Sequence, residues 1–456
     1  MCTVFKNSFR IIFITAIWMA AGVMCIAPAF AGAPSLIRDT EIENILRLWG
    51  TPIFEAAGLD PKAVHIILAQ SDTVNAFVAG GPNIFLYTGL IDKTSSPGEL
   101  IGVIAHETGH IAGGHLIRSR EAMERASYES IIGMILGVGV AIASGDASAL
   151  PAASLGGSGL AHRRLLAHSR IQESSADQAA LGFLEKAKIN PSGMASFMGK
   201  LKADNFVPEN QQSEYVRTHP LVDSRIEAME RRIEKSAYRA SAYPELWEEQ
   251  HARMKAKLIG FISPGKIPWV YDDRDKSIPA QYARAIAAYR NNQVDDALHR
   301  MDDLLKLEPN NPYFLELKGQ MLVDFSRLEE AIPYYRKAIK ILPEATLFRI
   351  ALAHALIESA GQNNPSLLVE AIEHLERSLR DESRSTRVHR LLATAYGRLD
   401  QHNNAKIHLA EEAVLQRRFS YAMQHAQSVL ESENEGSKLW LKAKDIISFI
   451  ETTKKG

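Results

Sequence analysis

A fixed interval of 34 residues separates equivalent positions in the C-terminal part of this 456-residue chain. Ala297 and Ala331 are one interval apart, and so are Pro309 and Pro343. A period of this length is typical of stacked helix pairs, in which each pair buries its apolar face only against its neighbours. The sequence therefore predicts an all-α solenoid over 280–456.

The residues at these positions resemble the tetratricopeptide repeat. Four repeats are expected, followed by a less regular fifth repeat over 411–450. Stacking of the helix pairs creates a concave surface whose side chains the fold itself does not need. Docking of another protein is therefore the favoured function of this surface, and a plain spacer is the alternative.

Charge and composition exclude several classes of protein. Lysine and arginine total 52 and aspartate and glutamate total 53, a net charge of −1, so no nucleic acid partner is expected. Hydrophobic residues make up 46% and charged residues 23% of the chain, which excludes wholesale disorder. Only the N-terminus carries an apolar run near membrane-spanning length, which excludes a protein with several membrane spans.

Residues 1–31 have the pattern of a secretory signal peptide. A positively charged start precedes the apolar run 11–26, and Ala29-Phe30-Ala31 forms a small-x-small cleavage site. We therefore expect export to the periplasm and removal of this segment. An uncleaved anchor is the alternative, and the helix-breaking Pro28 argues against it.

Both cysteines of the chain, Cys2 and Cys25, lie in this N-terminal segment. A lipid anchor on Cys25 is disfavoured because the bulky Met24 precedes it. Without the segment, the chain has no disulfide, no cysteine–zinc site and no cysteine nucleophile. Export without cysteines fits a bacterial periplasm.

A helical pattern that begins near Glu99 contains His106, Glu107 and His110 in the order H-E-x-x-H. Residues four apart share one helix face, so the two imidazoles can bind one Zn²⁺. Glu107 lies next to that face and can act as general base toward a metal-activated water. A chance occurrence of the motif is the alternative, and the helical context disfavours it.

A catalytic zinc needs a third protein ligand and one open position. The position six residues after His110 is Leu116, and His115 is one residue too early and would point away, so neither is expected to bind the metal. Glu173 is the expected third ligand. Asp177, one turn later on the same face, is expected to accept a hydrogen bond from a ligand histidine. For Glu173 alone, a solvated carboxylate is the alternative.

This combination of motifs resembles the HtpX and CAAX-prenyl-protease family of gluzincin metallopeptidases. The stretch that contains Asn75, Ala76 and Phe77 is similar to the strand segment of that family. His219, followed by Arg225, is similar to its third characteristic element. An exported member that also carries tetratricopeptide repeats is similar to the BepA-like group of periplasmic proteins.

The resemblance implies an α+β fold, with a mostly helical zincin-like metallopeptidase domain over 32–262, a linker over 263–279 and the repeat solenoid. It implies a zinc endopeptidase with one Zn²⁺ per chain, held by the two motif histidines and Glu173. The implied substrates are misfolded or stalled outer-membrane proteins, and the implied partner of the repeats is the outer-membrane β-barrel assembly machinery. The alternative function is a chaperone or assembly adaptor with a latched or mainly structural zinc site.

The element around His219 carries a hypothesis of its own. Pro220 keeps His219 out of a helix interior, so a surface histidine is the plain interpretation. The resemblance suggests instead that His219 approaches the metal as a fourth ligand, or as a latch that displaces the water until substrate arrives. Arg225 is then expected to steady an oxyanion or the loop that holds His219.

Two further segments have more than one interpretation. Val74–Leu86 reads as a hairpin, and its first strand is expected to pair with an extended substrate, with an ordinary hairpin as the alternative. Residues 131–143 are apolar or small but too few to cross a bilayer. A buried helix, a mobile lid and a peripheral membrane contact are the three alternatives for 131–160.

Overall fold

The structure is a computed structural model, and it describes residues 35–115, 170–202, 207–208, 212–361 and 364–455. The expected signal peptide over 1–31 and the segment 131–160 lie outside the described residues. None of the helices within the described ranges combines the length and apolar character that a membrane span requires.

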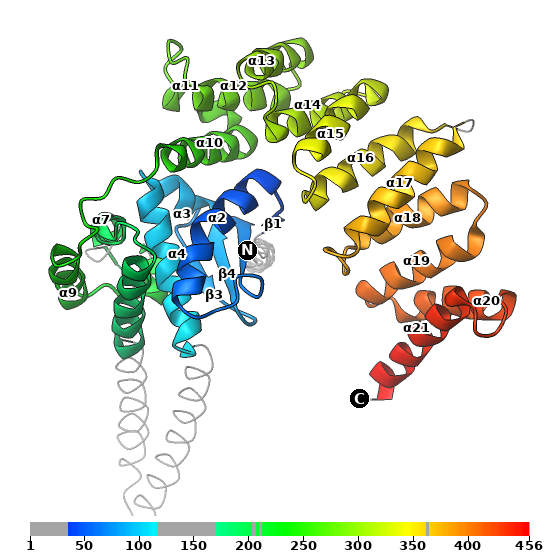
Figure 1. Ribbon diagram of the computed structural model, residues 1–456, viewed down its shortest axis with the longest axis horizontal. Coiled ribbons are helices and arrows are strands. Elements are labelled where there is room, and N and C mark those ends of the chain that lie inside the picture. The colour runs from blue at the N-terminus through cyan, green and yellow to red at the C-terminus, as the bar shows by residue number, and fades with distance from the viewer. Residues whose placement is uncertain (1–34, 116–169, 203–206, 209–211, 362–363, 456) are drawn as a thin grey trace, which may run out of the picture.

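A small sheet lies near the N-terminal end of the described chain (Figure 1). Its strands are β1 (Ser35–Ile37), β2 (His65–Gln70), β3 (Ala76–Val78) and β4 (Asn83–Tyr87). The spatial order is β1-β2-β4-β3, with β2 parallel to β4 and both outer strands antiparallel to their neighbours. The hairpin predicted over Val74–Leu86 is confirmed, and it places β3 at one edge of the sheet.

Helices surround this sheet, so the expected α+β, mostly helical fold of the N-terminal half is confirmed. The helices are α2 (Thr40–Ala56), α3 (Thr88–Lys93), α4 (Pro97–Ala112), α7 (Ser192–Leu201), α8 (Glu214–Thr218), α9 (Asp223–Glu234) and α10 (Glu245–Ile262). Residues 170–186 are also helical.

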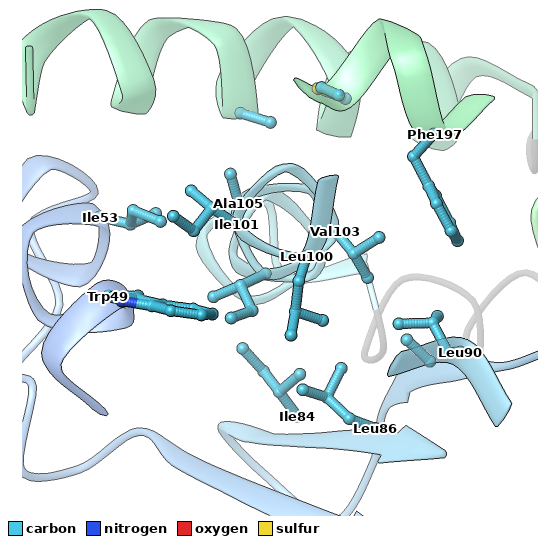
Figure 2. Packing of buried hydrophobic residues seen from close by; sticks show 14 of the residues in the cluster. Trp49, Ile53, Ile84, Leu86, Leu90, Leu100, Ile101, Val103, Ala105 and Phe197 are labelled. Atoms are coloured by element: carbon cyan, nitrogen blue, oxygen red, sulfur yellow. The ribbon is translucent and has the colours of Figure 1, made fainter. Parts of the chain in front are cut away.

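Helix α4, which carries the H-E-x-x-H motif, runs through the centre of the hydrophobic core. Figure 2 shows it end-on, with side chains of α2 on one side, side chains of β4 below it and Phe197 of α7 opposite. Every residue from Pro97 to Gly109 is buried. Leu100 and Ile101 are fully buried, and each such side chain stabilises the fold by about 1.5–3 kcal/mol. The core therefore holds the motif on a rigid support.

The segment expected to be a linker, 263–279, contains two short helices. They are η3 (Pro264–Lys266) and α11 (Ile267–Val270). Ile267 is buried in a small cluster with Ala256 of α10 and Ala283 of the next helix. The segment therefore packs against the last helix before it and the first helix after it.

The predicted solenoid is confirmed, because the rest of the chain forms successive antiparallel helix pairs. They are α12 (Ile278–Arg290), α13 (Val294–Leu307), α14 (Pro312–Asp324), α15 (Leu328–Ile341), α16 (Thr346–Ser359), α17 (Pro365–Ser378), α18 (Thr386–Arg398), α19 (His402–Leu415), α20 (Phe419–Ser432) and α21 (Lys438–Lys455). The periodic alanines Ala297 and Ala331 are fully buried between packed helices.

In four of the helix pairs, the turn between the two helices contains a residue with a positive φ angle. Asn292, Ser326 and Asp400 have φ angles of 57°, 62° and 58°, and Gly361 has 51°. Each lies between the two helices of a pair, where the chain needs one residue in the left-handed region. Small polar residues and glycine adopt this conformation at low cost.

The repeats curve back toward the peptidase half and contact its N-terminal elements (Figure 1). Arg38, next to β1, forms an ion pair with Glu382 at 2.6 Å, and Asn44 of α2 donates to Tyr313 of α14 at 3.2 Å. The first contact joins residues that are 344 positions apart in the sequence, and the second joins residues that are 269 positions apart.

A buried charged cluster reinforces this contact. The ammonium of Lys257, on α10, lies 2.7 Å from Asp39 and 3.0 Å from Glu41. The hydroxyl of Tyr282, on α12, donates to the same Glu41 carboxylate at 2.9 Å. The cluster thus ties α2 to both α10 and the first repeat helix.

Candidate active site

The two motif histidines face each other on α4. The Nε2 atoms of His106 and His110 are 3.1 Å apart, and both rings are largely buried. Glu107, between them in sequence, is 1% exposed. The helix therefore presents two imidazole nitrogens and one carboxylate to a single interior point.

The helix at 170–186 brings two carboxylates to His106, one beside each nitrogen of the ring. Gly109 makes this approach possible, because a Cβ there would lie 2.7 Å from the carbonyl oxygen of Ala176. Glu173 Oε2 lies 3.3 Å from His106 Nε2, and its Oε1 lies 3.4 Å from His110 Nε2. Glu173 thus stands where the sequence analysis expects the third ligand.

Asp177 contacts the far side of one ligand histidine. Its Oδ1 lies 3.0 Å from Nδ1 of His106, while Nε2 of that ring faces Glu173. A carboxylate in this position fixes the tautomer and the ring orientation of a metal-binding histidine. Asp177 therefore lies close enough to His106 to influence the orientation of its ring.

His219 closes the cluster from the C-terminal end of α8. Its Nδ1 lies 2.9 Å from Thr218 Oγ1, which leaves Nε2 facing the site, 3.5 Å from Glu107 Oε1. The ring stacks on Tyr215 with centroids 4.5 Å apart. His219 is 5% exposed, so the interpretation as a surface histidine is wrong.

Arg225, on α9, links the carboxylates to the backbone that follows His219. It donates to both oxygens of Asp177, lies 3.2 Å from Glu173 Oε2 and donates to the Pro220 carbonyl at 2.7 Å. Its charge is therefore engaged with protein groups on three sides.

The donor set fits a divalent cation. One ligand atom from each of His106, His110, Glu173 and His219 lies within 4.8 Å of the others. Two or three imidazoles with one carboxylate are common ligands of Zn²⁺. Glu107 Oε1 is buried without a hydrogen-bond partner among the described residues, as expected of a group that acts on a bound water.

The electrostatics of the cluster favour a positive charge at its centre. Burial alone would lower the pKa of His106, but its contacts with Asp177 and Glu173 raise that pKa to about 10. Burial raises the pKa of Glu107 to about 7, in the range suited to a general base near neutral pH. Burial lowers the pKa of His219 to about 4, so its ring is neutral at pH 7 and able to bind a metal.

The expected substrate strand, β3, contacts α4, the helix that carries the two motif histidines. Ala76 and Phe77 are in β3, at the sheet edge, and Phe77 stacks on Phe85 with centroids 5.1 Å apart. Asn75 is buried and donates to Glu214 of α8 at 3.0 Å. The start of the strand is thus tied to the helix that precedes His219.

Two further residues contact this cluster: His115, which the helical spacing predicted to point away, and Tyr215, for which no role was predicted. His115 lies with its Nδ1 3.0 Å from Nδ1 of His110, and Tyr215 supports the ring of His219. The Gly113-Gly114 pair was a signal for His115, because two glycines after a helix permit a sharp reversal of the chain. For Tyr215 the sequence offered no signal beyond its closeness to His219.

Comparisons with known proteins agree with this architecture. Residues 41–233 match the profile of Peptidase family M48, and residues 282–346 match a tetratricopeptide repeat profile. The resemblance drawn from the sequence motifs is thereby confirmed at the level of both domains.

Several characterised proteins are similar to this chain. The "Beta-barrel assembly-enhancing protease" of Yersinia pestis is 25% identical over 349 residues, which cover 75% of this chain and 70% of that protein. The protein of the same name from Escherichia coli (strain K12) is 25% identical over 335 residues, 72% of this chain and 67% of that protein. "Metalloprotease LoiP" of Escherichia coli is 30% identical over 174 residues, 37% of this chain and 64% of that protein.

Among solved structures, "MamA MSR-1 C2" aligns with 37% of this chain and 96% of its own, at 21% identity and a TM-score of 0.31. The predicted enzyme class rests on the sequence relatives and the family profile. The chain is a metalloprotease in which a domain similar to Peptidase family M48, over residues 41–233, is followed by tetratricopeptide repeats.

Proposed function

We propose that this protein is a periplasmic zinc-dependent endopeptidase. The observation that carries the proposal is the convergence of His106, His110 and Glu173 on one buried point beside the carboxylate of Glu107. The proposed division is a peptidase domain over 32–262, a linker over 263–279 and a repeat domain over 280–456.

The two histidines and Glu173 would hold the zinc ion. Zinc in such a site supplies a Lewis acid that polarises the scissile carbonyl and lowers the pKa of water. Glu107 takes the proton of the attacking water and passes it to the leaving amine, for which a pKa of about 7 is well matched. Proton transfer of this kind contributes about 10²–10⁴-fold to the rate.

The neighbouring residues would keep these groups in place. Asp177 orients the ring of His106, and Arg225 holds Asp177 while it anchors the Pro220 carbonyl. We assign Arg225 to positioning of the His219 loop, the second of the two roles expected for it, because its donors are already engaged.

An extended polypeptide is the proposed substrate, held along β3, which is an outer strand of the sheet in the described part of the chain, with Asn75, Ala76 and Phe77. An edge strand offers unpaired backbone groups to an incoming strand. The name of the similar proteins from Yersinia pestis and Escherichia coli, "Beta-barrel assembly-enhancing protease", supports misfolded or stalled outer-membrane proteins as the substrates and the β-barrel assembly machinery as the partner.

The repeat domain is the proposed docking surface for that partner. A cavity of 480 Å³ lies where the repeats face the start of the peptidase half. Its lining is strongly charged and includes Arg38, Glu316, His354 and Arg387. Such a surface supports binding of a polar protein segment rather than a purely apolar one.

Degradation of an unfolded casein-like protein by residues 32–456 tests the proposal. Cleavage that stops on chelation and returns with added zinc is the expected result. Cleavage that continues after complete removal of the metal would contradict it.

A second candidate function is a chaperone or assembly adaptor whose zinc site is latched or mainly structural. The position of His219 favours it, because a fourth protein ligand closes a site that a catalytic zinc needs open. His219→Ala separates the two: gained cleavage identifies a latched enzyme, whereas one bound zinc per chain and continued silence favour the adaptor.

A further inference from the structure

His115 contacts one of the proposed metal ligands on the side away from the cluster. Nε2 of His110 faces His106 at 3.1 Å and Glu173 at 3.4 Å, so its Nδ1 points the other way. There it lies 3.0 Å from Nδ1 of His115, and the two rings meet edge to face with centroids 5.0 Å apart. Two ring nitrogens at this distance share one proton, so one of them donates and the other accepts.

The chain is built to bring His115 into this position. Helix α4 ends at Ala112, and Gly114 has φ 61°, which reverses the chain at that point. Gly113 leaves room for the returning ring, because a Cβ there would lie 2.4 Å from His115 Nε2. The fold of these three residues therefore depends on the absence of side chains at both glycines.

A second anchor ties His115 to the helix that carries the third ligand. The side chain of Gln172 donates to the backbone carbonyl of His115 at 3.3 Å, and Gln172 directly precedes Glu173. The His115 residue is 3% exposed. A buried residue whose ring contacts α4 and whose backbone is bonded to a second helix does not reorient freely, so the contact with His110 is a fixed feature of the site.

We infer that His115 is a positioning residue that accepts the Nδ1 proton of His110 and thereby keeps Nε2 of that ring directed at the metal. The inference rests on the proposed metal site. With this contact, both motif histidines have a partner at Nδ1, because Asp177 lies 3.0 Å from Nδ1 of His106.

Replacement by leucine and by asparagine forms a matched test. The two side chains have the same shape, but Oδ1 of asparagine can accept a hydrogen bond where Nδ1 of His115 does, whereas leucine cannot. The full chain is loaded with zinc, and its Kd is measured by competition with a chelator. Loss of an outer partner typically weakens metal binding about 10–100-fold. We expect His115→Leu to lose this much and His115→Asn to recover most of it.

Two controls keep the test decisive. His115→Phe keeps a ring at this position but has no hydrogen-bond acceptor, so its Kd for zinc should match that of His115→Leu. The absorption spectrum of bound Co²⁺ should shift in both variants. His251→Phe, at a buried histidine bonded to Thr94, should leave the Kd unchanged. Thermal melting confirms that each variant is folded before its Kd is compared.

The outcomes separate this inference from the proposed function. Equal Kd values for wild type, His115→Leu and His115→Asn, with one zinc per chain, would overturn the role of His115 and leave the metal site standing. Equal weakening in the leucine and asparagine variants would also overturn it, because packing alone would then explain the loss. A wild-type chain that binds no divalent metal would overturn the proposed function itself.

Discussion

Arg225 and Asp177 form a buried bidentate ion pair, in which Nε donates to Oδ2 at 2.7 Å and Nη2 donates to Oδ1 at 2.9 Å. The same carboxylate lies against His106, and the same guanidinium holds the Pro220 carbonyl. One pair therefore connects α4, the helix at 170–186, α9 and the segment that positions His219.

The stability of the peptidase domain should depend strongly on this pair. Arg225→Met leaves the Asp177 charge buried without its partner, and such a change costs about 3–5 kcal/mol. Arg231→Met is the matched control on α9, because its pair with Glu227 is exposed and such pairs contribute about 0–1 kcal/mol. Urea denaturation measures both, and equal losses in the two variants would contradict the role of the buried pair.

Acid should destabilise the repeat domain through a buried histidine pair. Nδ1 of His389 lies 3.1 Å from Nδ1 of His408 between α18 and α19. Burial, together with the nearby charges of His389 and Lys442, lowers the pKa of His408 to about 3. The unfolded chain, with an ordinary histidine pKa of about 6.5, then binds more protons than the folded chain below that pH.

The sign follows from that difference. The contribution of His408 to the free energy of unfolding is fully present above pH 6.5. It falls by about 1.4 kcal/mol per pH unit as the pH drops from there toward 3. Urea unfolding at pH 7, 6, 5 and 4 measures the slope, which His408→Leu should flatten. His402→Leu, at an exposed position, should leave the slope unchanged. A wild-type slope as flat as that of His408→Leu would contradict the prediction.

The contact of α2 with α10 and with the first repeat helix should depend on Lys257. Lys257→Met leaves the Glu41 and Asp39 carboxylates without their cation, at a cost of about 3–5 kcal/mol. We expect the repeats to separate from α2, which small-angle scattering detects as a larger radius of gyration. Adding Glu41→Leu should restore part of the lost stability, because an apolar pair can replace a buried ion pair. An unchanged radius in Lys257→Met would show that the cluster does not hold the halves together.

The parts of the site that follow from helix periodicity were predictable. His106 and His110 share a face of α4 because they are four residues apart, and Glu173 and Asp177 share a face for the same reason. Their meeting across 63 residues was inferred from a family resemblance, because no local rule brings two helices together. The close approach at Gly109 provides the physical reason.

The contact of His115 with His110 was not predicted, because linear spacing on a helix places it away from the metal face. The helix ends at Ala112, and the left-handed turn at Gly114 reverses the direction of the chain. The period of the repeats predicted the solenoid, but it did not predict the return of the solenoid to α2. That contact depends on side chains such as Arg38 and Glu382, which are far apart in the sequence.

Comparison of wild type with Glu107→Gln tests the central claim most directly. Both chains are loaded to one zinc per chain, and kcat/KM is measured on an unfolded casein-like substrate. The account predicts that Glu107→Gln binds zinc as wild type does and loses at least about 100-fold in kcat/KM, because the general base is gone. A zinc-loaded Glu107→Gln variant that cleaves at the wild-type rate would contradict the assignment of Glu107 and, with it, the proposed mechanism.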